Sequence, residues 1–309
     1  FDDWFIGTTT MKKGIPDQNP SSTLVFDYGD ITSLENLFSE HRGEIASVII
    51  EPATTLIPCN NSCKTPLDFE SPCVNCPNSS KNFLHQVQLL CNSEGALFVL
   101  DEMITGFRWH LQGAAVYFGV EPDISTFGKA MANGFSVATV GGRREIMQVG
   151  ATDTLGKERT FLLSTTHGGE MSSLAAFVET ANIYREHNVI CHLWEYGKRL
   201  REGLIGVAKK LSMDDYFLME GPDICLNYVL LDANGSISLP LRTLFAQEMV
   251  RHGVLMPWIA ISLAHGNAEL EITLTAAEEA LKVVSQALEN GVENFLDGPA
   301  IKPVFRKNN

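Results

Sequence analysis

Two short apolar segments decide how this chain folds: LFVLD at residues 97–101 and ISTFGK at residues 124–129. Each begins with the length and apolar character of a strand buried in a parallel sheet. The first ends in Asp101, and the second ends in Gly128 and Lys129. Open α/β sheets bind ligands at the carboxyl edge of their strands, so the sequence predicts an acid and an amine at one sheet edge.

This pair of groups suits one chemistry in particular. A lysine at a strand end can lose its proton and form a Schiff base with a carbonyl compound, and a carboxylate can keep a pyridinium nitrogen protonated. Pyridoxal phosphate chemistry requires both of these groups. The alternative is that Asp101 caps a helix or pairs with an arginine, and that Lys129 is solvated, as most lysines are.

The sequence around both residues resembles that of a known family. The segments DEMITGFR at 101–108, YFGVEPD at 117–123 and FGK at 127–129 closely resemble the class III pyridoxal-phosphate aminotransferases, and within them the glutamate-1-semialdehyde 2,1-aminomutase branch. The resemblance extends over residues 4–288. It implies fold type I, with a large mixed-sheet α/β domain over residues 1–188 and a small C-terminal α+β domain over residues 189–309. It also implies that the N-terminal part of the family fold is absent.

The resemblance assigns roles to four residues of the large domain. Lys129 would form the Schiff base, Asp101 would hold the pyridine nitrogen, and Met103 would pack on one face of the ring. Glu51, in a Glu-Pro pair after a predicted strand, would mark the edge of the site. The sequence of the loop at residues 53–56 differs from that of the aminomutase branch, and this difference favours an aminotransferase.

A second motif lies at residues 160–170, TFLLSTTHGGE. A strand followed by hydroxyl and glycine residues at a helix start can bind a phosphate through backbone N–H groups, although a plain capped helix has the same pattern. The resemblance implies that Thr166 reaches the phosphate of the cofactor in a neighbouring subunit, with Thr165 as the substitute if the alignment shifts by one. That role predicts a homodimer.

An apparent insertion at residues 58–83 changes the composition abruptly. Cys59, Cys63, Cys73 and Cys76 form two close pairs that could bind one zinc ion and so order a segment with few apolar residues. The alternatives are free thiols in a loop or, in an exported protein, disulfides. An iron–sulfur cluster is a further, weaker option.

Composition narrows the class of protein. The chain has 309 residues, 37 of them acidic and 23 basic, and a net charge of −14. This charge disfavours nucleic acid and anionic membranes as partners and favours a small-molecule substrate. The sequence has no apolar run of membrane-spanning length and no leader pattern, so we expect a cytoplasmic protein.

Apolar spacing and capping residues predict the other elements. Helices are expected at residues 31–43, capped by Asp30, and at 81–93, 171–186, 193–211, 241–252 and 276–290. Further strands are expected at residues 45–50, 137–142, 223–231 and 254–257, and the first two of these are expected to be buried.

Three functions follow from these observations. The first is an aminotransferase that forms a Schiff base on Lys129 and transfers an amino group to a keto or aldehyde substrate. The second is an aminomutase that moves the amine within one substrate. The third is a non-catalytic assembly or zinc-dependent interaction module.

Overall fold

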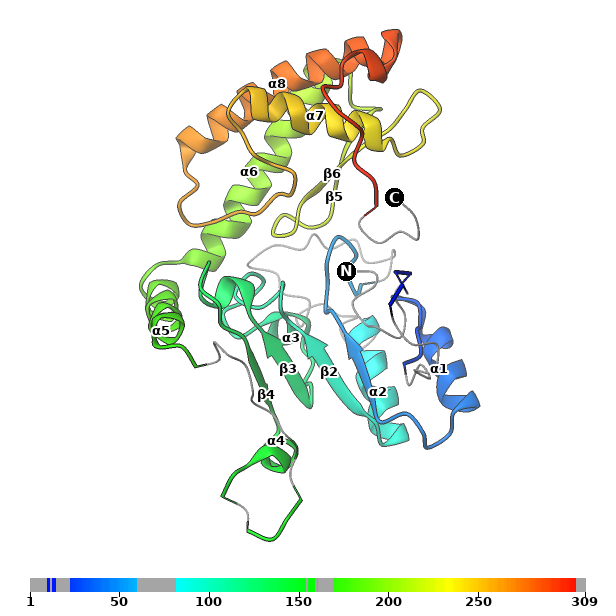
Figure 1. Cartoon of the computed structure of the whole chain (residues 1–309), viewed down its shortest axis with the longest axis vertical. Helices are drawn as coiled ribbons and strands as arrows, with labels where there is room; N and C mark the ends of the chain where they lie inside the picture. Colours follow the sequence, from blue (N-terminus) through cyan, green and yellow to red (C-terminus); the bar gives the residue numbers. More distant parts are fainter. Residues whose placement is uncertain are drawn as a thin grey trace.

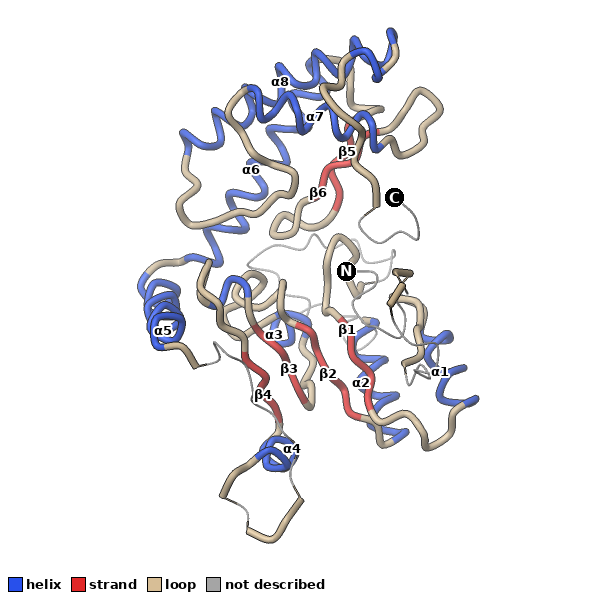
Figure 2. Tube along the Cα trace, viewed as in Figure 1, coloured by secondary structure: helices blue, strands red, loops and turns tan. Residues whose placement is uncertain are grey.

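The computed structural model describes residues 10–11, 13–14, 23–59, 82–153, 155–158, 160 and 169–303. A sheet with flanking helices forms one part of the molecule, and three long helices with a small hairpin form the other (Figure 1; Figure 2). None of the helices in the described ranges is long and apolar enough to cross a membrane.

The main sheet has four strands in the order β1-β2-β3-β4. The strands are β1 Ser47–Ile50, β2 Leu97–Asp101, β3 Ile124–Phe127 and β4 Thr139–Gly142. The first three are parallel, and β4 runs antiparallel to β3. All four were predicted, but the expectation that β4 is buried is wrong. Most of its residues are exposed because, among the residues that the structure describes, β4 is the last strand of the sheet and pairs only with β3.

Local signals set the first two helices. Helix α1 (Ile31–Glu40) begins at Asp30, whose carboxylate accepts a hydrogen bond from the Thr32 N–H at 2.9 Å. Helix α2 (Phe83–Glu94) begins at Asn82 and ends at Gly95, which has the left-handed conformation (φ +73°) favoured by glycine. A short helix, α3 (Ala114–Phe118), was not predicted.

The C-terminal part contains α6 (Val189–Lys210), β5 (Phe217–Glu220), β6 (Asn227–Leu230), α7 (Leu239–Arg251) and α8 (Asn267–Asn290). Strand β5 was missed, because only its antiparallel pairing with β6 makes it a strand. The strand expected at residues 254–257 is wrong: this segment is a loop, and its Met256 carbonyl accepts a hydrogen bond from Tyr228 at 2.9 Å. Helix α8 starts earlier than predicted because the Glu269 carboxylate caps the Gly266 N–H at 2.8 Å.

Five smaller or connecting elements make up the rest of the secondary structure in the described residues. They are η3 (Lys129–Met131), α4 (Arg144–Met147), η4 (Gln148–Gly150), α5 (Met171–Glu186) and η5 (Val292–Asn294). Helix α5 lies at one margin of the molecule and contacts both η3 and α6 (Figure 1).

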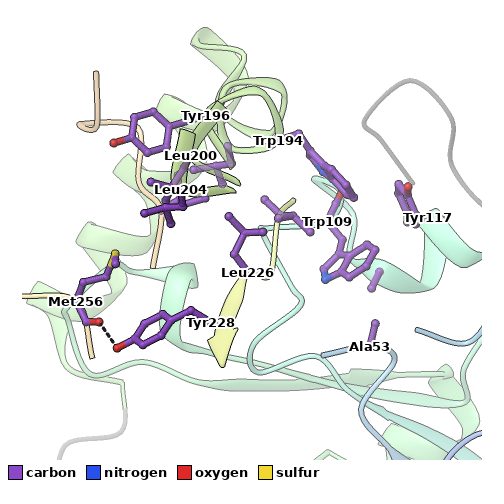
Figure 3. Close-up of a cluster of buried hydrophobic side chains, with 14 of the residues drawn as sticks. Ala53, Trp109, Tyr117, Trp194, Tyr196, Leu200, Leu204, Leu226, Tyr228 and Met256 are labelled. Carbon is purple, nitrogen blue, oxygen red and sulfur yellow. Dashed lines mark hydrogen bonds between the residues drawn. The ribbon is translucent and has the colours of Figure 1, made fainter. Parts of the chain in front are cut away.

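One hydrophobic core joins the two parts of the molecule. Trp109 and Tyr117, which precede and belong to α3, meet Trp194 of α6 at ring-centroid distances of 5.4 and 5.6 Å. Figure 3 shows these rings beside Ala53 and Leu226. The Trp194 indole N–H also donates to the Trp109 carbonyl at 3.4 Å. Packed aromatic rings therefore hold the C-terminal part against the sheet. The domain boundary between residues 188 and 189 stays a prediction.

Candidate active site

Three predicted residues lie at the carboxyl edge of the sheet. Glu51 follows β1, Asp101 ends β2, and Lys129 follows β3 by two residues. Asp101 is level with Thr126 of β3, and Ile50, immediately before Glu51, is level with Leu100. The parallel register therefore brings the acid and the amine to one edge, as the sequence analysis expected.

The structure fixes one oxygen of the Asp101 carboxylate. Oδ1 accepts hydrogen bonds from the Met103 N–H and the Thr126 hydroxyl, each at 3.1 Å. Among the described residues, nothing donates a hydrogen bond to Oδ2. The half-buried carboxylate is therefore oriented and still has an oxygen available for a ligand.

Lys129 occupies an unusual backbone conformation. Its φ is +46°, in the left-handed region that costs most L-residues about 1–2 kcal/mol. It opens the one-turn helix η3, against which α5 packs, and its side chain is exposed. No carboxylate in the described ranges pairs with its ammonium group. Residues strained in this way cluster at functional sites, where the surrounding structure holds them.

Met103 packs against the turn that carries the lysine. A Cβ atom placed on Gly128 would lie 2.4 Å from Met103 Cε and 3.0 Å from its sulfur. Glycine at position 128 therefore makes room for the Met103 side chain directly beside Lys129. This contact places Met103 in the region where the resemblance assigns it to the ring.

Glu102 is a buried acid that the sequence analysis missed. Its carboxylate accepts hydrogen bonds from the N–H groups of Ala114 (2.6 Å) and Ala115 (3.0 Å), and from the Thr105 hydroxyl (3.0 Å). Burial raises its pKa, against the opposing effect of these three donors. Gly113 has φ +98°, and a Cβ there would lie 2.6 Å from the carboxylate. Glu102 thus ties both ends of the loop at residues 103–113 to α3.

Phe107 links that loop to α5. It has φ +62°, and its ring packs edge-on against Phe127 (6.1 Å), Phe177 (6.2 Å) and Tyr184 (5.8 Å). The Tyr184 hydroxyl donates to the Phe107 carbonyl at 2.6 Å. The cluster, Phe107 with these three rings, connects the ends of β2 and β3 to α5.

Glu51 lies among groups from distant parts of the sequence. Tyr28 donates its hydroxyl hydrogen to the carbonyl of the next residue, Pro52, at 2.7 Å. Burial is the main cause that raises the pKa of Tyr28, and the negative charge of Glu51 contributes. Glu51 also raises the pKa of Cys225, a thiol of the C-terminal part. The edge of the site therefore includes residues from both parts of the molecule.

Other predicted site residues cannot be placed. Thr165 and Thr166 lie outside the residues that the structure describes, as do Cys63, Cys73 and Cys76. Cys59 is described and is half-buried. Within the described ranges, no group of three or more histidine, cysteine, aspartate or glutamate residues could hold a metal ion.

The described residues fit pyridoxal phosphate. The fit rests on a carboxylate with one fixed and one available oxygen, and on an amine without an ion-pair partner in the described chain, at the ends of neighbouring strands. A carboxylate can bind a protonated ring nitrogen, and an amine can bind an aldehyde.

Comparison with known proteins agrees with this geometry. Residues 76–215 match the family model for class-III aminotransferases. The chain is similar to these enzymes over that stretch. It is 29% identical over 286 residues to glutamate-1-semialdehyde 2,1-aminomutase of Alkaliphilus oremlandii, covering 89% of this chain and 62% of that protein. It is 33% identical over 210 residues to the protein of that name from Acetivibrio thermocellus, covering 66% and 44%. The chain thus spans less than two thirds of these class-III relatives.

Solved transaminase structures share the fold. The internal-aldimine structure of the FumI protein of Sphingopyxis sp. MTA144 matches with a TM-score of 0.67 and 23% identity, over 86% of this chain and 58% of that one. An omega-transaminase from Sphaerobacter thermophilus matches with a TM-score of 0.67 and 21% identity, over 88% and 60%. The predicted fold class, fold type I with a mixed-sheet α/β domain, is confirmed over the matched part.

Proposed function

We propose that this chain carries the active site of a pyridoxal-phosphate-dependent aminotransferase that transfers an amino group to a keto or aldehyde substrate. One observation carries the proposal. An amine and a carboxylate, each with capacity left for a ligand among the described residues, stand at the ends of neighbouring parallel strands. The family match over residues 76–215 supports it.

Each residue has a distinct task in this proposal. When bound, pyridoxal phosphate supplies an aldehyde and an electron-withdrawing ring. Lys129 Nζ would hold the cofactor through that aldehyde and would carry a proton to and from the substrate as general base and acid. Asp101 Oδ2 holds a proton on the ring nitrogen, while Thr126 and the Met103 N–H keep the carboxylate in place. Met103 supports one face of the ring.

The central test is covalent trapping. The purified chain is mixed with pyridoxal phosphate, the visible spectrum is recorded, and the adduct is reduced with borohydride and mapped by mass spectrometry. We expect the label on Lys129, and we expect Lys129→Ala to lose both the band and the label. Lys198→Ala, which removes an exposed lysine of α6, is the matched control and should keep both.

Asp101→Asn tests the second residue. It should still be trapped, because Lys129 is intact, but amine conversion should fall at least about a hundredfold, since an amide does not hold the ring nitrogen protonated. An unlabelled wild-type chain, or a label spread over many lysines, would contradict the proposal and favour a non-catalytic module.

An aminomutase is the second candidate. It is favoured by the relatives from Alkaliphilus oremlandii and Acetivibrio thermocellus, which carry that name. The departure at residues 53–56 favours the aminotransferase. The two differ in stoichiometry: an aminotransferase needs a separate amino donor for turnover, whereas an aminomutase isomerises one substrate alone.

We also propose a homodimer. Helix α5 exposes Met171, Leu174 and Val178, which lie on one face at helical spacing, and the same helix packs against η3, which Lys129 opens. A second copy covering this face would also allow Thr166, or Thr165, to reach the neighbouring phosphate. Val178→Asp should shift the sedimentation coefficient from dimer to monomer, and Glu179→Asp on the same helix should not.

Two further proposals concern a zinc site and the location of the protein. Cys59, Cys63, Cys73 and Cys76 could form a structural zinc site, which metal analysis of the wild type and of Cys73→Ser would decide. The absence of zinc from the wild-type protein would dismiss the site. A cytoplasmic location also stays a prediction.

A further inference from the structure

Arg108 lies between two aromatic residues that pack in different places. Phe107 packs into the aromatic cluster beside β3, and Trp109 is 1% exposed in the core between the two parts of the molecule. The backbone turns between them, with the Arg108 N–H donating to the Thr105 carbonyl at 3.2 Å. The left-handed conformation of Phe107 is part of this turn. Arg108 is held by both aromatic neighbours and is half-buried.

The guanidinium group of Arg108 lacks a partner within the described chain. Its Nε atom is buried and meets no hydrogen-bond acceptor there, and no carboxylate oxygen in the described ranges lies within ion-pairing distance. Two other arginines of the described chain have carboxylate partners. Arg201 pairs with Asp223 at 2.6 Å, and Arg251 pairs with Glu248 at 2.7 Å. A half-buried cation without an anion is costly to the fold, so Arg108 is a candidate to bind an anion that the described residues do not supply.

The charge of Arg108 reaches Cys225 at the edge of the candidate active site. Its positive charge acts on the Cys225 thiol, lowering a pKa that burial raises, and its effect there exceeds the opposite effect of Glu51. Cys225 belongs to the turn at residues 221–225. A Cβ atom on Gly221 of this turn would lie 3.3 Å from Thr55 Cα, four residues after Glu51. Arg108 and Glu51 thus both act electrostatically on the thiol of this turn.

Contacts to α6 fix that turn in place. Arg201 of α6 binds the Asp223 carboxylate and donates to the Gly221 carbonyl. Gly197 of α6 lies directly against the Asp223 carbonyl, where no larger residue fits. The turn that carries Cys225 is therefore held in place by α6.

We propose that Arg108 binds the carboxylate of the amine substrate and so determines specificity for amino acids over simple amines. The proposal rests on the proposed aminotransferase function. The planar fork of a guanidinium group matches the two oxygens of a carboxylate, and the negative charge of Glu51 would disfavour an anion placed elsewhere along the edge. A phosphate group could use the same fork, so the cofactor phosphate is the competing source of the anion.

The first experiment needs neither cofactor nor substrate. The rates at which iodoacetate, an anion, and iodoacetamide, its neutral analogue, modify Cys225 are compared by peptide mapping. We expect Arg108→Gln to lower the ratio of the two rates at least about threefold, because a positive charge near the thiol attracts the anion. Glu51→Gln should raise the ratio. Arg144→Gln, which removes an exposed arginine of α4, is the matched control.

The second experiment identifies the anion. Unreduced protein loaded with pyridoxal phosphate is mixed with pairs such as 3-aminobutyrate and isopropylamine, which differ only in the carboxyl group, and the decay of the cofactor band is followed. In Arg108→Gln, the concentration of the amino acid that gives half the maximal rate should rise at least about tenfold. The value for the amine and the affinity for pyridoxal phosphate should stay within about twofold. Arg108→Lys, which keeps the charge but loses the fork, should lie between the two proteins.

The outcomes separate this proposal from the proposed function. If borohydride does not trap the cofactor on wild-type Lys129, the proposed function fails, and the substrate role of Arg108 fails with it. If trapping succeeds, three results overturn the role of Arg108 alone. The first is that Arg108→Gln leaves the alkylation ratio unchanged, or that Cys225 does not react. The second is that the wild type does not prefer the amino acid of any pair. The third is that Arg108→Gln loses affinity for pyridoxal phosphate instead of for the amino acid.

Discussion

Replacing Glu102 with alanine should destabilise the fold by about 3–5 kcal/mol. The carboxylate is fully buried and accepts hydrogen bonds at 2.6, 3.0 and 3.0 Å from Ala114, Ala115 and Thr105. Alanine would leave two backbone N–H groups without an acceptor at the start of α3. Each such loss costs about 1–3 kcal/mol, and the cavity left by the carboxyl group adds to this.

Urea denaturation provides the assay. The midpoint should fall by roughly 1 M or more with an unchanged slope, because the folded and unfolded states expose the same surface as before. Glu35→Ala, which removes an exposed glutamate of α1, is the control and should stay within about 0.5 kcal/mol of the wild type. A Glu102→Ala variant as stable as this control would refute the reasoning that Glu102 holds the loop at residues 103–113.

Three shorter predictions follow from other contacts. Gly128→Ala should cost about 1–3 kcal/mol in urea denaturation, because its Cβ would lie 2.4 Å from Met103 Cε; an unchanged midpoint would show that Met103 moves freely. Burial raises the pKa of Cys91 from 9.0 to about 12, so its thiolate fraction at pH 8, and its alkylation rate measured by mass spectrometry, should be about a thousandfold below those of the unfolded chain. Burial also raises the pKa of Glu102 above 4.5, so its proton-linked contribution to stability is complete below pH 4.5 and is lost as pH rises through the folded-state pKa. Relative to Glu102→Gln, the wild type should therefore lose stability over that interval, and parallel pH profiles would contradict this.

Much of the fold was predictable because its signals are local. Asp30 and Gly95 mark helix ends by their own side-chain and backbone chemistry, and the apolar runs of β1, β2 and β3 have the composition of buried strands. The sequence-based predictions failed where contacts between strands, rather than local sequence, determine the structure. Strand β5 exists through its pairing with β6, and residues 254–257 form a loop although their composition resembles a strand.

The candidate site divides in the same way. The sequence by itself determined which residue types stand at the strand ends, so Asp101 and Lys129 could be named together with their chemistry. Tertiary structure alone decided the left-handed backbone of Lys129, the three hydrogen bonds of Glu102 and the approach of Arg108 to Cys225. The physical reason is separation along the chain. A strand or a helix cap is formed by neighbouring residues, whereas the surroundings of a buried charge come from segments that meet only when the core has packed.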